Sequence, residues 1–109
     1  MNTEKIQKDI ENSNFFNMNG TILRTLNVIE NSRCTLSSLE FVFKGHTEHN
    51  EFIESVKYLS VSGYINLRNI DTGTPTEFRA DKFDDTEMLL SAKGIQVLRG
   101  MITDNCINV

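Results

Sequence analysis

Histidine, cysteine and acidic side chains are the residues here that are best suited to hold a metal ion. His46 and His49 lie three positions apart with Glu48 between them, and Cys34 stands elsewhere. A metal site needs three or four converging ligands, and the sequence contains neither a His-Glu-x-x-His nor a Cys-x-x-Cys spacing. We therefore expect no metal site.

Motifs for catalysis are missing as well. Gly20 stands alone, without the other glycines of a phosphate-binding loop, and no Gly-x-Ser-x-Gly elbow occurs. Asp84 and Asp85 are adjacent, which does not make the separated acid and base of a glycosidase. We expect a protein that is not an enzyme, with no catalytic residues and no cofactor.

Length and composition favour one folded domain. The chain has 109 residues, of which 39% are hydrophobic, and its net charge is −4. No apolar run approaches the roughly 20 residues needed to span a bilayer, and the start of the chain lacks a secretory hydrophobic region. Two cysteines do not form a disulfide framework. We expect a cytoplasmic location.

The N-terminal segment is predicted to be a short helix followed by an Asn-rich linker. Ile6 and Ile10 lie four apart on one helical stripe. Asn19 is the expected N-cap of the next helix, whose apolar residues recur at positions 22, 23, 26 and 29. The predicted organisation is an appended segment 1–18, a domain 19–101 and a tail 102–109.

Two further helices are expected before the first strand. Ser37 to Glu40 matches a capping box, with Leu36 and Phe41 placed as a hydrophobic staple, and Gly45 offers a C-cap. Thr47 is the expected N-cap of a third helix that stops at 62–63.

Alternating residues then predict strands. Tyr64–Arg68 alternates apolar and polar side chains, and the residues at 71–75 form a turn cluster. Either 76–80 or 86–90 supplies the returning strand, and Ser91 caps a last helix that ends near Gly100. This order predicts an α+β fold of the winged helix-turn-helix type, with a three-helix core, a hairpin wing and a closing C-terminal helix.

Two stretches also resemble a known family. The segment from Thr47 to Ile65 is similar to the third helix and following strand of winged-helix proteins, and Leu90 to Leu98 is similar to their "Leu-Thr-x-Lys-Gly-x-x-x-Leu" entry to a closing helix, with Ser91 replacing the usual Thr. With the helix from Thr21, they resemble the YjcQ-like family of small bacterial and phage winged-helix proteins, over roughly residues 20–100. The resemblance implies a winged helix and carries no established activity; the segment between 68 and 86 departs from it.

One functional hypothesis is a DNA-binding transcriptional regulator, since the third helix of a winged helix lies in the major groove. Cations near that helix and the wing would contact phosphates, and two polar side chains at its start would reach base edges. These nucleic-acid-binding candidates are Arg33, Lys44, His49, Asn50, Lys57, Arg68 and Arg79. Capping and solvent exposure explain His49 and Asn50 equally well, and the scattered cations are also typical of solvated surface.

The alternative is a protein-interaction module that meets a basic partner. Residues 47–58 carry a net charge of −2 and residues 69–87 a net charge of −4, which opposes binding to phosphates. The partner-binding candidates of this hypothesis are Glu48, Glu51, Glu54 and Tyr58. A structural explanation also stands, because carboxylates in a first helical turn favour the helix dipole.

Aromatic residues outside the predicted core offer a third possibility. Phe15 and Phe16, followed by Met18, are placed either to pack against a second copy in a homodimer or to fold back onto the same domain. The sequence leaves this choice open.

Overall fold

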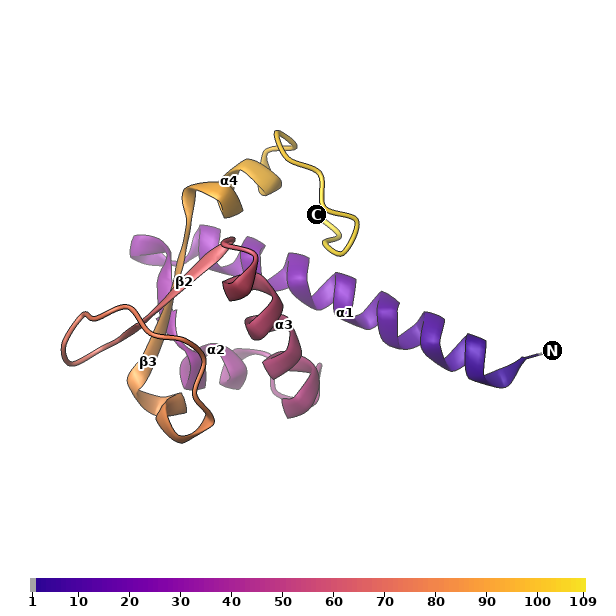
Figure 1. Cartoon of the computed structure of the whole chain (residues 1–109), viewed down its shortest axis with the longest axis horizontal. Helices are drawn as coiled ribbons and strands as arrows, with labels where there is room; N and C mark the ends of the chain where they lie inside the picture. Colours follow the sequence, from indigo (N-terminus) through magenta and orange to yellow (C-terminus); the bar gives the residue numbers. More distant parts are fainter. Residues whose placement is uncertain (1) are drawn as a thin grey trace.

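Four α-helices and a three-stranded antiparallel sheet form an α+β fold, as predicted (Figure 1). The computed structural model describes residues 2–109. The helices are α1 (Thr3–Val28), α2 (Leu36–Val42), α3 (His49–Val61) and α4 (Ala92–Leu98), with short 3-10 turns at Glu30–Ser32 and Ala80–Asp85; the strands are β1 (Arg33–Thr35), β2 (Ile65–Asn69) and β3 (Thr86–Leu90). In the part of the chain described, none of the helices is both long and apolar enough to cross a membrane.

Helix α1 is continuous, so the predicted break before Asn19 is wrong. Its N-cap is Asn2, whose side chain accepts from the Lys5 N–H, and the helix runs through the Asn-rich stretch without interruption. Asn19 is fully buried in mid-helix, where its amide donates to the Cys106 carbonyl at 2.8 Å. The first half of α1 projects beyond the rest of the molecule (Figure 1). A contact from the far end of the chain therefore overrides the local turn preference of asparagine.

Helix α2 begins earlier than the capping box predicts. Thr35 is its N-cap and accepts from the Ser38 N–H at 3.2 Å, so Ser37 lies inside the helix. The predicted staple is also wrong, because Phe41 is 73% exposed. Gly45 adopts a φ of +86° after the helix, which suits a glycine in the connecting turn.

The sheet has the order β1-β3-β2. Arg33–Thr35, predicted only as an extended link, is a strand that pairs with β3. The strand predicted at 64–68 is confirmed within one residue, and of the two candidate returning segments 86–90 is the strand. Residues 76–80 form no strand; next to them Pro75 makes an isolated bridge to Arg68.

One hydrophobic core joins the helices to the inner face of the sheet. Ile22, Leu26, Phe52, Leu59 and Met88 are all fully buried in it, one or two from each of α1, α3 and β3. This core fixes α1 against α3, and these two helices carry most of the polar side chains described below.

Two details fix α4 against the sheet. The Ser91 hydroxyl accepts from the Gly94 N–H at 3.1 Å, so the predicted cap is confirmed, and it donates to the Gly63 carbonyl at 2.6 Å. A Cβ on Gly94 would lie 2.3 Å from the Tyr64 carbonyl oxygen. Glycine is therefore required where α4 crosses the start of β2.

Candidate interaction site

Three of the cations proposed to meet phosphate are engaged within the chain. Arg68 donates through Nε to Glu87 on the neighbouring strand. Arg79 pairs with Asp81 at 3.0 Å, and the Lys57 ammonium lies 5.4 Å from the centre of the Phe78 ring. Each cation is partly neutralised or shielded by its own neighbour, which lowers the positive potential of this face.

His49 has a structural role at the contact between α2 and α3. Its Nδ1 lies 2.5 Å from Glu40 Oε2, and its ring lies 5.6 Å from that of Phe83. The side chain therefore helps to attach the segment before β3 to the helices. Asn50, the next residue, is exposed.

Arg33 and Lys44 are the remaining proposed phosphate contacts. Both are exposed, and neither forms an ion pair with the side chains that the structure describes, which do not include that of Glu30. Arg33 begins β1 and Lys44 lies in the turn after α2, so they belong to different elements. Both side chains are accessible to solvent.

Tyr58, a predicted partner-binding residue, is engaged within the chain. Its hydroxyl donates to Asp104 Oδ2 at 2.5 Å, and its ring meets that of Phe15 edge-on with centroids 5.4 Å apart. Tyr64 donates to the same Asp104 oxygen at 2.7 Å. Phe15 thus folds back onto its own chain, and Phe16 lies beside it with ring centroids 6.0 Å apart.

The hydrogen bonds at Asp104 shift the pKa values of all three groups. Burial raises the pKa of Tyr64 to about 12, and the hydrogen bond to Asp104 and its negative charge act in the same direction; the pKa of Tyr58 is raised for the same reasons. Burial alone would raise the pKa of Asp104. The two tyrosine hydroxyls and the Cys106 N–H outweigh burial and hold that pKa below its usual value.

Acidic side chains from two helices line a narrow groove between α1 and α3. Glu11, Asn14 and Phe15 come from α1, and Asn50, Glu51 and Glu54 come from α3, around a volume of about 310 Å³. None of these three glutamates forms an ion pair with any residue from 2 to 109. The groove therefore presents three uncompensated carboxylates, two amides and one aromatic ring. We call it the acidic groove.

The sequence predicts Glu51 and Glu54 as partner-binding residues and Asn50 as a nucleic-acid-binding residue, and the structure brings these three together. The sequence places Glu11 and Asn14 in an appended segment and predicts no role for them. No local signal in that segment points to α3. Glu48 is exposed at the N-cap position of α3 and does not line this groove.

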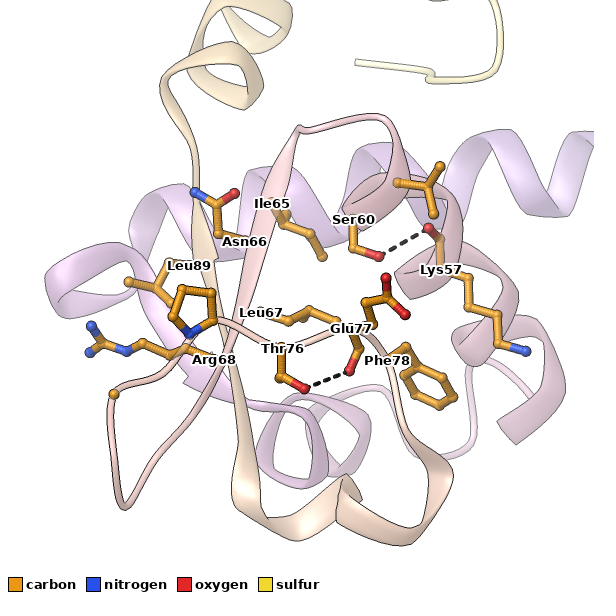
Figure 2. Close-up of a pocket in the computed structure, with 13 residues that line it drawn as sticks. Lys57, Ser60, Ile65, Asn66, Leu67, Arg68, Thr76, Glu77, Phe78 and Leu89 are labelled. Carbon is orange, nitrogen blue, oxygen red and sulfur yellow. Dashed lines mark hydrogen bonds between the residues drawn. The ribbon is translucent and has the colours of Figure 1, made fainter.

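A second, larger groove lies between the C-terminal half of α3, β2 and the segment after the turn. Figure 2 shows Ile65 and Leu67 pointing into the space beside Ser60. Its volume is about 910 Å³, and its charged lining residues are Lys57, Arg68 and Glu77. Its surface is mostly apolar and Arg68 is paired with Glu87, so the groove offers contact area and little selectivity for a charged ligand.

Among the side chains that the structure describes, no three His, Cys, Asp or Glu are grouped so that they could hold a metal ion. Comparison of the chain with protein-family models, curated proteins and solved structures found no match.

Proposed function

We propose that the chain is a winged-helix module that binds a cationic segment of a protein partner in the acidic groove. The order helix, strand, helix, helix, strand, strand, helix supports the winged-helix assignment, as does a sheet in which β3 lies between β1 and β2. The three helices before β2 then bury one core, and the β2–β3 connection is the wing. This assignment makes α3 the helix that meets a ligand.

The observation that carries the choice of ligand is the convergence of Glu11, Glu51 and Glu54 on one groove. An arginine or lysine side chain entering it would meet carboxylates on both walls and the ring of Phe15. Asn14 and Asn50 add hydrogen-bonding groups to a guanidinium or to the backbone beside it. A basic, extended segment has the chemistry that this groove accepts.

Phosphate binding at α3 and the β2–β3 connection is disfavoured. Each neutralised phosphate needs a cation, and Arg68, Arg79 and Lys57 are already engaged by neighbouring groups of the chain. Uncompensated glutamates on α3 would repel a nucleic-acid backbone. The same glutamates attract a cationic partner.

The proposal is tested with a fluorescent peptide of alternating Arg and Gly residues. We expect its anisotropy to rise with added protein at low salt and to fall as salt is added. Glu51→Lys combined with Glu54→Lys removes the binding. Asp71→Lys with Glu77→Lys makes the same change in net charge outside the acidic groove and serves as the matched control. Equal loss in both pairs, or no binding by the native chain, contradicts the proposal.

DNA binding is the second candidate, and two exposed groups near the start of α3 favour it. Lys44 lies in the turn before α3 without an ion pair among the described residues, and Asn50 is exposed in the first turn of the helix. This candidate requires duplex binding that weakens steeply with salt and is lost in Lys44→Glu. Duplex binding that Lys44→Glu leaves unchanged rules it out.

A further inference from the structure

Two residues of the C-terminal segment, Cys106 and Asn108, tie it to α1 by hydrogen bonds. The Asn19 amide donates to the Cys106 carbonyl at 2.8 Å. Asn108 donates its backbone N–H to the Phe16 carbonyl at 3.1 Å, and its own carbonyl accepts from Arg24 Nη1 at 2.8 Å. Between these anchors the Ile107 side chain is 94% buried, since only 6% of it is exposed. The segment is therefore docked along the helix.

Gly20 supplies the space for this docking. A Cβ built on Gly20 would lie 1.6 Å from the Asn108 carbonyl oxygen, a distance that no neighbouring side chain can relieve because the obstructing atom belongs to the backbone. Glycine inside a helix otherwise lowers its stability by about 1 kcal/mol relative to alanine. Its presence at this position is explained by the segment that lies on it.

The other end of the segment reaches α3. Asp104 accepts from Tyr58 and Tyr64, and its Oδ1 accepts from the Cys106 N–H at 2.8 Å. The Tyr58 ring in turn packs edge-on against Phe15, which lines the acidic groove. A continuous path of contacts thus leads from the C-terminal segment through Tyr58 to the wall of the groove.

We propose that residues 104–108 act as a clasp that keeps the acidic groove formed by holding α1 and Tyr58 in place. The clasp bonds α1 within two turns of Glu11 and Asn14, and it bonds α3 one turn beyond Glu54. Release of the clasp frees Phe15 and the first half of α1 from α3. The groove then loses one of its two walls. This inference rests on the proposed function for its ligand and on the contacts above for its mechanism.

Tyrosine emission reports the clasp directly. Tyr58 and Tyr64 are the two tyrosines of the chain, which has no tryptophan, and both donate to one carboxylate. A carboxylate that accepts a phenol hydrogen bond quenches its fluorescence, so release of the clasp brightens the emission. The signal needs no ligand and no label.

The experiment compares Gly20→Ala with Asn27→Ala, an exposed position of the same helix that contacts neither the clasp nor the groove. Far-UV circular dichroism verifies the helices, and truncation after Thr103 removes the clasp without changing any residue of α1. In Gly20→Ala and in the truncated chain we expect brighter tyrosine emission, faster amide exchange at residues 11–17, and affinity for the Arg-Gly peptide reduced about fivefold or more. Asn27→Ala leaves all three unchanged.

Separate outcomes judge the two proposals. The clasp proposal is overturned if tyrosine emission is unchanged in the truncated chain. It is also overturned if the emission rises while amide exchange at 11–17 stays unchanged, and neither outcome depends on peptide binding. If the peptide affinity persists after the emission and the exchange have both changed, the clasp does not control the acidic groove. Failure of the native chain to bind the peptide overturns the proposed function alone, because emission and exchange are measured without ligand.

Discussion

Arg68 and Glu87 stand directly opposite each other in the pairing of β2 with β3, and the guanidinium Nε donates to the carboxylate. Both side chains are more buried than exposed. The sequence placed Arg68 beside the wing as a phosphate contact and gave no sign of this partner, because the register of two strands separated by a long connection is not visible locally. The Arg68 guanidinium is therefore engaged in an ion pair within the sheet.

Reversing this charge is expected to destabilise the fold. Arg68→Glu places two carboxylates opposite each other, and we expect the free energy of unfolding to fall by about 1 kcal/mol. Lys44→Glu, which changes the same charge at an exposed turn, stays within about 0.5 kcal/mol of the native chain. Urea unfolding followed by circular dichroism measures both. Equal stability of the two variants would show that the cross-strand pair contributes nothing.

The close approach of α4 to β2 gives a second stability prediction. Gly94→Ala drives a Cβ toward the Tyr64 carbonyl oxygen, and we expect a loss of about 1–3 kcal/mol, in the range of other overpacked sites. Gln96→Ala, on the exposed side of the same helix, is the control. A gain in stability from Gly94→Ala, as expected for helix propensity alone, would contradict the contact.

Elements whose signals lie within a few residues could be predicted from the sequence. The alternation of apolar and polar side chains at 64–68 predicts β2, and Ser91 predicts the start of α4. Both signals are local, because side-chain period and helix capping depend on residues close in sequence. The α+β class followed from the order of these elements. Asn19 shows where local reasoning fails: asparagine favours caps and turns, yet here its amide nitrogen donates to the carbonyl of Cys106, 87 positions away.

The site was predicted only in part for the same reason. Glu51 and Glu54 were visible as exposed acids of the third helix. Their counterpart Glu11 was not, since nothing near it indicates that α1 continues past Phe15 and lies beside α3. The sequence predicts Tyr58 as a partner-binding residue, but its hydroxyl donates to Asp104 in the C-terminal segment, 46 positions away.

Amide hydrogen exchange distinguishes the two halves of α1. Residues 3–14 are exposed, whereas Ile22, Leu23 and Leu26 are fully buried. Because a short helix without tertiary contacts is marginal in water, we expect rapid exchange up to about residue 10 and strong protection from 19 to 26. Uniform protection along the whole helix in a monomeric sample would contradict this division, and sedimentation analysis of the same sample establishes the monomer.

The hydrogen bonds at Asp104 predict how stability depends on pH at both extremes. A phenol whose pKa is raised in the folded state contributes stability below its ordinary value of 10.0 and loses it as the pH rises; for Tyr64 this loss extends to about pH 12. Asp104 has the opposite sign, because its pKa is held below its ordinary value of 3.8. Its contribution is present above pH 3.8 and disappears as the pH falls further.

Tyrosinate absorbance measures the alkaline half of this prediction directly. In the native chain both tyrosines are expected to ionise above pH 10, and in Asp104→Ala they ionise at lower pH, because the acceptor and its negative charge are gone. Tyr58→Phe leaves a single titration that belongs to Tyr64. If Asp104→Ala leaves both titrations unchanged, burial alone sets these pKa values. The shared carboxylate would then have no energetic role in attaching the C-terminal segment to α3.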